Sequence, residues 1–172
     1  MLLVVASNGL LDGPNCLLIR ELQSDARLSL AELGRRVGLS APAVAERLAR
    51  LEREGVIRGY RADVDPGALG LTLGVVIRVR PAPRQIAKVA DAARASEEVV
   101  VCERVTGDDC FVLRANVRDV GHLEELIDRF TPFGQTTTSL VQSAPVPSRG
   151  PAVPGALSPT TASARTAWRC PR

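Results

Sequence analysis

Two arginines at helical spacing offer the clearest chemistry in the chain. Arg47 and Arg50 follow Ala43 at intervals of four and three residues, so all three lie on one side of a helix. Guanidinium groups on an outward helix face can bind phosphate or the edge of a guanine base. The alternative is a solvated face balanced by neighbouring glutamates, and charge alone does not separate the two. An apolar stripe a quarter turn away predicts the buried side: Val44, Leu48 and Leu51.

Residues for catalysis or metal binding are scarce. The chain has one histidine, His122, and one lysine, Lys88, and it lacks a GxxxxGK[ST] phosphate loop. Its four cysteines include no CxxC pair, so we expect no metal site and no cofactor. We interpret His122 as a structural or solvated surface residue. Cys102 and Cys110 are interpreted as small buried residues, with a thiol pair as the alternative.

Three short helical patterns between residues 11 and 62 position the arginine helix. The first covers about Pro14 to Gln23. The second starts at Ser29, which with Glu32 forms a capping box, and it ends at Gly38 with Leu30, Leu33 and Val37 predicted to be buried. The third runs from the N-cap Ser40 to about Glu54, before Gly55. Two helices joined by a short turn that contains glycine are typical of a helix-turn-helix.

The second half of the chain has a different pattern. Apolar residues alternate along residues 71–79, and further strands are predicted at 99–105, 111–117 and 135–142. Helical spacing intervenes at 86–93 and 123–130. The order strand, helix, strand, strand, helix, strand predicts an α+β, ferredoxin-like domain with an antiparallel sheet. Val100, Cys102 and Val112 indicate an apolar sheet face, through which we expect the domain to dimerise.

Composition sets the boundaries of these parts. We predict a helix-turn-helix domain at residues 11–62, a linker at 63–70, the ferredoxin-like domain at 71–143, and a disordered Pro/Ala-rich tail at 144–172 that includes Trp168 and Cys170. Residues 12–62 carry nine arginines and seven acids, residues 63–143 carry nine basic and twelve acidic residues, and the tail carries four arginines and no acid. A basic front end suits a polyanion. No apolar run is long enough to cross a bilayer, so we expect a cytoplasmic protein.

Several segments together resemble the Lrp/AsnC family, named after the leucine-responsive regulatory protein and the asparagine-synthase regulator. They are Leu11-Asp12, RLSLAELGRRVGLS, ERLARLEREGVIRGYRADVDPGALG and VTGDDCFVLRANVRD, which occur in the family's order over about residues 11–143. The resemblance implies a winged-helix-like DNA-binding domain followed by a βαββαβ domain. It also implies dimers or octamers, double-stranded DNA as a partner, and an amino acid as effector. Asn15 stands where the family usually has Asp.

The helix-turn-helix geometry assigns residues to DNA. In such motifs the start of the second helix reaches base edges in the major groove, and later basic residues contact phosphates. We therefore expect Arg50 to contact phosphate. The residues predicted to lie in the groove are Ser40, Ala41, Pro42, Ala43, Glu46 and Arg47.

The resemblance also implies an effector site in the turn between the second and third strands. There the family typically has a glycine, a short spacer, an Asp and an aromatic residue, but Cys110 occupies the Asp position and Asp109 lies one residue earlier. A loop carboxylate suits the ammonium group of an amino acid, and threonine hydroxyls suit its carboxylate. A purely structural turn and strand are the alternative. The candidate residues are Thr106, Gly107, Asp108, Asp109, Cys110, Thr136, Thr137 and Thr138.

Two other functions remain open at this stage. Siroheme decarboxylases, which act on a tetrapyrrole, resemble this family in fold, but they would need histidine and basic residues grouped in a cleft. A single histidine argues against that enzyme. The other alternative is an assembly module whose helix-turn-helix no longer binds DNA. We expect a regulator and not an enzyme.

Overall fold

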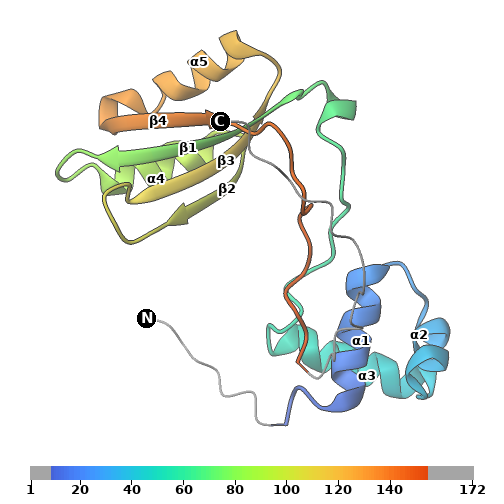
Figure 1. Cartoon of the computed structure of the whole chain (residues 1–172). Helices are drawn as coiled ribbons and strands as arrows, with labels where there is room; N and C mark the ends of the chain where they lie inside the picture. Colours follow the sequence, from blue (N-terminus) through green and yellow to red (C-terminus); the bar gives the residue numbers. More distant parts are fainter. Residues whose placement is uncertain (1–8, 155–172) are drawn as a thin grey trace, which may run out of the picture. The chain divides into compact units, whose positions relative to one another are not determined.

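The structure, a computed structural model, describes residues 9–154 and divides the chain into two compact units. Of the described residues, the N-terminal unit comprises 9–61 together with 148–154, and the C-terminal unit comprises 62–147 (Figure 1). Residues 144–154 of the predicted tail contain no helix or strand. The rest of that tail, with Trp168 and Cys170, lies outside the described residues.

The N-terminal unit contains three helices whose ends carry recognisable caps. They are α1 (Gly13–Ser24), α2 (Leu30–Val37) and α3 (Ala41–Arg53). Each begins after a side-chain cap, Asp12, Ser29 or Ser40, whose oxygen accepts a backbone N–H that the first helical turn leaves unpaired. Gly38 ends α2 in the left-handed region at φ 72°. The predicted helix boundaries are confirmed to within one or two residues.

The turn between α2 and α3 depends on two glycines. Gly38 supplies the left-handed conformation, and a side chain at Gly34 would collide with the backbone carbonyl of Leu39. The Leu39 N–H donates to the Gly34 carbonyl at 2.9 Å, which holds the chain close to α2. Gly34 is therefore required for the close approach that aims α3.

Two local predictions for α2 were wrong. Leu30 is 43% exposed, because the buried side of this short helix is centred on Leu33, which is 1% exposed. The capping box is also only half formed. Ser29 accepts from the Glu32 N–H at 3.2 Å, but the Glu32 carboxylate pairs with Arg35 and Arg36 instead of returning to the helix start. The core of the unit comprises Leu18, Leu33, Val44, Leu48 and Leu51.

The C-terminal unit has the predicted order of strands and helices. Its elements are β1 (Leu73–Pro81), α4 (Ile86–Ala95), β2 (Val99–Arg104), β3 (Phe111–Val117), α5 (Val120–Asp128) and β4 (Gly134–Leu140). The strands form one antiparallel sheet in the order β2-β3-β1-β4. Figure 1 shows α4 and α5 on the same side of this sheet. The ferredoxin-like prediction is confirmed. Short 3-10 helices precede β1 (Gly67–Leu69) and β4 (Thr131–Phe133).

The two faces of the sheet differ in burial. Alternate residues of β1 and β3 pack against the helices, and their neighbours form the open face. The core on the helix side comprises Val75, Ile77, Val79, Val89, Ala93, Phe111, Leu113, Ala115, Val117, Leu123, Leu126 and Phe130.

The prediction of which residues share the apolar sheet face was wrong. Cys102 lies opposite Leu113 and therefore points to the helix side, whereas Val112 points to the open face. The cause is an irregularity at Val100, where β2 advances two residues while β3 advances one. Such a bulge reverses the facing of every residue after it. The open face instead carries Val76, Arg78, Arg80, Val101, Glu103, Val112 and Arg114.

Candidate functional sites

The start of α3 presents the predicted DNA-contacting residues with different degrees of exposure. Ser40, Pro42, Glu46 and Arg50 are exposed, whereas Ala41, Ala43 and Arg47 are half-buried. The Ser40 hydroxyl accepts from the Ala43 N–H at 3.4 Å, so it caps the helix and still has its own proton to donate. The exposed face is therefore centred on Pro42, Glu46 and Arg50, and it also includes Ala49 and Arg53.

Arg47 is turned toward α1 and not fully outward. Its Nη1 lies 2.7 Å from Asp12 Oδ2 and 3.0 Å from Asn15 Oδ1. Asn15 is 3% exposed, and its amide nitrogen also donates to the Leu10 carbonyl. The hydrogen bond from Arg47 is the main cause that lowers the pKa of Asp12, helped by the Asn15 N–H. Arg47 thus connects the middle of α3 to the first turn of α1.

This connection was not found in the sequence, because its members are 32 and 35 residues apart. The available signal was Asn15 itself, a polar residue among the buried positions of α1. A buried polar side chain requires a partner.

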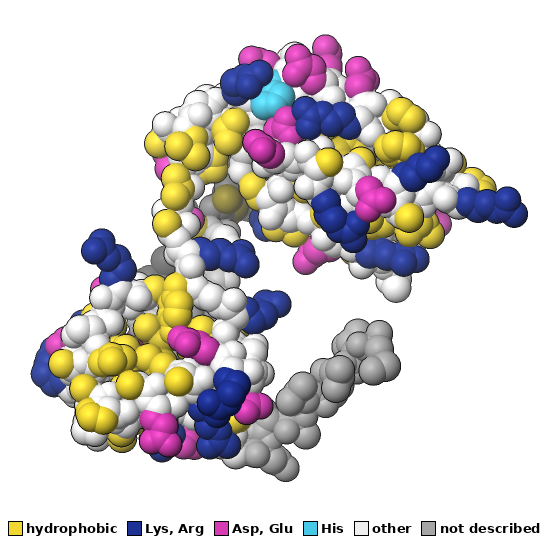
Figure 2. All heavy atoms as spheres, turned by 180° about the vertical axis from the view of Figure 1, so that it is seen from behind, with side chains coloured by type: hydrophobic (Ala, Val, Ile, Leu, Met, Phe, Trp, Pro, Cys, Tyr) yellow, Lys and Arg dark blue, Asp and Glu magenta, His cyan; other side chains and the backbone are white. Residues whose placement is uncertain are grey.

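Three other arginines of the N-terminal unit are paired with acids, namely Arg35, Arg36 and Arg53. Arg36 binds Glu21 at 2.7 Å and Glu32 at 2.9 Å, and Arg35 also binds Glu32. These two guanidinium groups lower the pKa of Glu32 to about 2. On the face shown in Figure 2, arginines of this unit stand beside acidic side chains. Arg50, like Arg20 and Arg27, makes no ion pair with any described residue, but it differs from them in lying on the exposed face of α3.

The predicted effector loop is a tight turn between β2 and β3. The Val105 N–H donates to the Cys110 carbonyl at 2.9 Å, and Gly107 has φ 111°. Asp109 and Cys110 are half-buried, while Thr106, Gly107 and Asp108 are exposed. Both carboxylates reach the open face of the sheet: Asp109 Oδ2 lies 3.9 Å from Arg78 Nε, and Asp108 Oδ1 lies 3.8 Å from Arg80 Nη2.

The strand β4 separates the three predicted threonines. Thr137 lies opposite Arg78 and shares the open face with it. Thr136 and Thr138 lie opposite the buried Val79 and Ile77, so they point to the helix side and are half-buried. The structure therefore brings the loop carboxylates and Thr137 to one face, and it does not bring Thr136 or Thr138 to that face.

A separate groove lies between α4 and β2 and has a volume of about 710 Å³. It contains none of the predicted effector residues. Its wall includes Cys102, which is exposed, so the prediction of a small buried residue was wrong for this cysteine. Partial loss of hydration is the main cause that raises the pKa of this thiol. Arg94 and Arg104 are the charged members of a lining that is otherwise mostly aliphatic.

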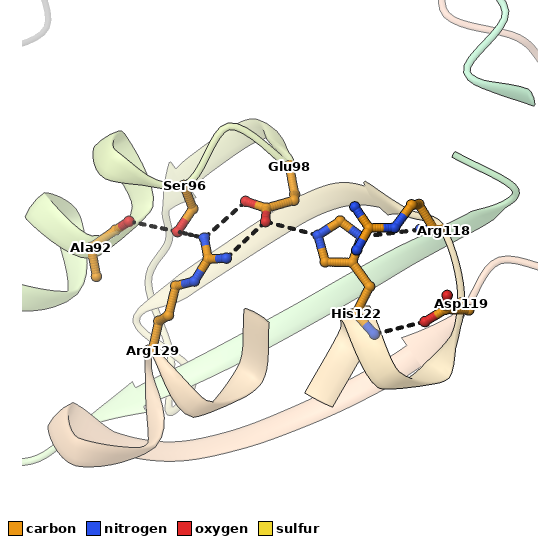
Figure 3. A network of polar contacts seen from close by, with 7 residues as sticks. All are labelled: Ala92, Ser96, Glu98, Arg118, Asp119, His122 and Arg129. Atoms are coloured by element: carbon orange, nitrogen blue, oxygen red, sulfur yellow. Dashed lines mark hydrogen bonds and ion pairs between the residues drawn. The ribbon is translucent and has the colours of Figure 1, made fainter. Parts of the chain in front are cut away.

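His122 is 8% exposed, so the prediction of a surface histidine was wrong. Figure 3 shows why: the imidazole lies inside a polar network that links α5 to the loop after α4. The Arg118 N–H donates to Nδ1 at 3.3 Å, which leaves the proton on Nε2 to donate to Glu98 Oε1 at 2.9 Å. In Figure 2 the histidine is bordered by basic and acidic side chains.

Glu98 is the centre of this network. Its two oxygens accept from both terminal nitrogens of Arg129, at 2.8 and 2.9 Å. That bidentate pair is the main cause that lowers the Glu98 pKa to about 2, with a smaller contribution from His122. Arg129 also donates to the Ser96 hydroxyl, which in turn donates to the Ala92 carbonyl. The network fixes α5 against α4, so the histidine has a structural role.

Other classes of site find no support in the described residues. No three His, Cys, Asp or Glu side chains there are grouped as metal ligands. No helix of residues 9–154 is long and apolar enough to cross a membrane.

A three-helix DNA-binding unit followed by a ferredoxin-like unit defines a class of two-domain transcriptional regulator. Family models match both halves: an AsnC-type helix-turn-helix domain at residues 11–52 and an Lrp/AsnC ligand binding domain at residues 74–151. The chain belongs to the Lrp/AsnC family. This confirms the resemblance found in the sequence.

Similar proteins include regulators from several bacteria. The HTH-type transcriptional regulator LrpA of Mycobacterium tuberculosis is 38% identical over 132 residues, which are 76% of this chain and 88% of the relative. LrpC of Bacillus subtilis is 32% identical over 126 residues, or 73% and 88% of the two chains.

Two similar solved structures contain L-methionine. A feast or famine regulatory protein of M. tuberculosis complexed with L-methionine has a TM-score of 0.78 and 33% identity, with 84% of this chain and 99% of that chain covered. A transcriptional regulator of Neisseria meningitidis in complex with L-methionine has a TM-score of 0.74 and 27% identity, with 81% and 94% covered.

Proposed function

We propose that this chain is a transcriptional regulator that binds double-stranded DNA as a dimer or a larger assembly of itself. An amino acid acts as its effector and changes its assembly or its DNA affinity. The protein acts in the cytoplasm by binding and not by catalysis. The observation that carries the proposal is the exposed start of α3, which presents Pro42, Glu46 and Arg50 from a helix-turn-helix.

The residues of α3 divide into two roles. Ser40, Ala41, Pro42, Ala43 and Glu46 are proposed to face the base edges in the major groove, and Arg50, with no acid paired to it, contacts phosphate. Arg47 uses one terminal nitrogen for Asp12 and Asn15. Its Nε and Nη2 have no other hydrogen-bond partner among the described residues, so they remain donors for a base.

We propose that effector binding is thermodynamically coupled to assembly and to DNA binding. A ligand shifts the population of two assemblies only if it binds one of them more tightly. An amino acid meets this condition if its site is complete in one assembly and incomplete in the other. Support comes from the match to the ligand binding domain and from the L-methionine complexes of two relatives.

The test begins with selection of a preferred duplex by the full chain from random DNA. We expect an imperfect palindrome with half-sites about one helical turn, or a multiple, apart. Affinity for this duplex and for random duplex is then measured over a series of salt concentrations. Arg50→Ala should weaken both and lower the slope of log K against log salt by about 0.9. Arg47→Ala should weaken mainly the preferred duplex.

Arg20→Ala is the matched control, because Arg20 is an exposed arginine on α1 with no ion pair among the described residues. It should leave affinity and slope unchanged. No preference for any duplex over random competitor at moderate salt would refute the DNA-binding part. That result would favour an assembly module that has lost DNA binding.

A further inference from the structure

The chain after β4 returns to the DNA-binding unit. Residues 148–154 group by their contacts with the N-terminal unit and not with the sheet that precedes them. The side-chain amide of Gln23, in the last turn of α1, donates to the Pro151 carbonyl at 3.0 Å. A Cβ at Gly150 would lie 2.5 to 3.0 Å from atoms of the same side chain, so the backbone of this segment lies directly against Gln23.

The segment that begins with these residues is strongly basic. Residues 12–62 carry nine arginines and seven acids, a net charge of +2, and the four arginines after residue 147, with no acid among them, raise it to +6. A unit with this charge attracts a polyanion. The four arginines are Arg149, Arg165, Arg169 and Arg172.

The alternative is that this segment neutralises acids at the end of α1. Glu21, the acid nearest to Gln23 on that helix, is already bound to Arg36 at 2.7 Å. Arg149 is exposed, and its guanidinium makes no ion pair or hydrogen bond with any described residue. All five of its donors therefore remain for another anion.

The contact with Gln23 lies close to the recognition helix. Arg47 of α3 contacts Asn15, and Gln23 follows Asn15 by eight residues of α1, which is about 12 Å. Phosphates are spaced about 3.4 Å along each strand of a duplex, so this distance spans about three to four of them. Gln23 lies about 80° around α1 from Asn15, whereas Arg20 lies about 140° around and points further from α3.

We propose that residues 148–172 are a second DNA-binding element, an arginine arm that binds phosphates of the duplex beside the half-site contacted by α3. This inference rests on the proposed function, because it requires a DNA-binding unit. The contact of Pro151 with Gln23 fixes where the arm begins. The ligand binding domain model ends at residue 151, so the family match assigns nothing to the last three arginines. Phosphate contacts carry no sequence information, so the arm adds affinity and not specificity.

The test compares two variants of the full chain in which all four arginines of the arm are replaced. The glutamine variant removes the charges, and the lysine variant keeps them at the same positions. The glutamine variant carries Arg149→Gln, Arg165→Gln, Arg169→Gln and Arg172→Gln.

Affinity for the preferred duplex and for random duplex is measured over a series of salt concentrations. The glutamine variant should lower the slope of log K against log salt by up to about 3.6, and by more than Arg50→Ala does. The ratio of the two affinities should stay unchanged. The lysine variant should keep the wild-type slope, because lysine binds phosphate as a point charge.

Two further measurements locate the contacts. A duplex trimmed to the two half-sites lacks the flanking phosphates, so the wild type and the glutamine variant should bind it with the same slope. Gln23→Ala removes the hydrogen bond to Pro151 and should weaken long duplexes about 2- to 5-fold. Gln142→Ala is the matched control, because Gln142 is an exposed glutamine just after β4 with no side-chain hydrogen bond to a described residue.

The possible failures are distinguishable. If the wild type prefers no duplex over random competitor, the DNA-binding part of the proposed function fails and this inference fails with it. If the wild type binds a preferred duplex but the glutamine variant lowers the slope less than Arg50→Ala does, only the inference is overturned. It is also overturned if the lysine variant loses as much as the glutamine variant, or if trimming the duplex leaves their difference from wild type unchanged. Wild-type affinity of Gln23→Ala would overturn the attachment of the arm to α1.

Discussion

The two units are stabilised by similar contacts in different surroundings. The C-terminal unit has a core of twelve buried apolar residues, whereas the N-terminal unit has five. Each also has a polar connection between segments that are distant in sequence. Glu98 joins Arg129 and His122 with its side chain 12% exposed, and Asp12 joins Arg47 with its side chain 40% exposed. Because its core is smaller and its ion pair is more exposed, we expect the DNA-binding unit to be the less stable of the two.

The largest expected effect follows from the small N-terminal core. Leu33→Ala should destabilise that unit by about 2–5 kcal/mol, because Leu33 is 1% exposed and its removal leaves a cavity. Amide hydrogen exchange should accelerate throughout α1, α2 and α3 while β1 and β3 stay protected, and DNA binding should be lost.

Leu30→Ala provides the matched control on the same helix. Leu30 is 43% exposed, so its truncation should change stability by less than about 1 kcal/mol. Equal effects of the two substitutions would contradict the argument from burial. Faster exchange in the C-terminal unit would show that the two units are not stabilised independently.

The next largest effect concerns the buried network of the C-terminal unit. Glu98→Gln keeps the shape of the side chain and removes its charge, so it should cost about 1.5–3 kcal/mol at pH 7. Because the folded-state pKa of Glu98, about 2, lies below its ordinary value of 4.5, the carboxylate stabilises the fold above about pH 5. This contribution is lost as pH falls toward 2.

The measurement is urea unfolding of wild type and Glu98→Gln between pH 7 and pH 2.5. The difference in free energy of unfolding should shrink as pH falls through this range. Glu124→Gln, an exposed acid on α5, should show no such pH-dependent difference. If the difference in free energy of unfolding between wild type and Glu98→Gln stayed constant down to pH 2.5, it would contradict the lowered pKa of Glu98.

The order of elements was predictable because local patterns encode it. Alternation along β3 gave its bounds, Phe111–Val117, to the residue, and the N-caps Ser29 and Ser40 gave the starts of α2 and α3. Each of these signals lies within a few neighbouring residues. The family resemblance added the ligand binding domain, which the family model confirms, and the prediction of an effector loop, which stays a prediction.

What was not predictable depends on contacts between distant residues. The bulge at Val100 reverses the facing of Cys102, and β-strand alternation alone does not reveal a bulge. His122 can be buried because Glu98, 24 residues earlier, accepts a hydrogen bond from its ring. The sequence did not separate Thr137 from Thr136 and Thr138, because only the pairing of β4 with β1 shows which threonine lies on the open face. Local periodicity carries no information about these partners.

The smallest expected effect on stability separates the two roles of Asp12. Asp12→Ala removes the N-cap of α1 and should cost about 1 kcal/mol. Asp12→Asn keeps an oxygen to accept the Asn15 N–H and removes only the charge beside Arg47. It should cost less than Asp12→Ala, because ion pairs between exposed side chains contribute roughly 0–1 kcal/mol. Urea unfolding followed in the N-terminal unit measures both values.

DNA affinity of the same two variants then decides what Arg47 does. If Arg47 only holds α3 against α1, Asp12→Asn should weaken the preferred duplex, because the helix loses part of its positioning contact. If Arg47 also donates to a base, Asp12→Asn should leave or increase affinity for the preferred duplex, since a competing acceptor has lost its charge. Asn15→Ala, which removes the neutral partner, should weaken binding in both cases by disturbing the buried contact to Leu10. Because Asp12 is more exposed than Glu98, we expect Arg47 to exchange its partner for a base more readily than Arg129 could leave Glu98.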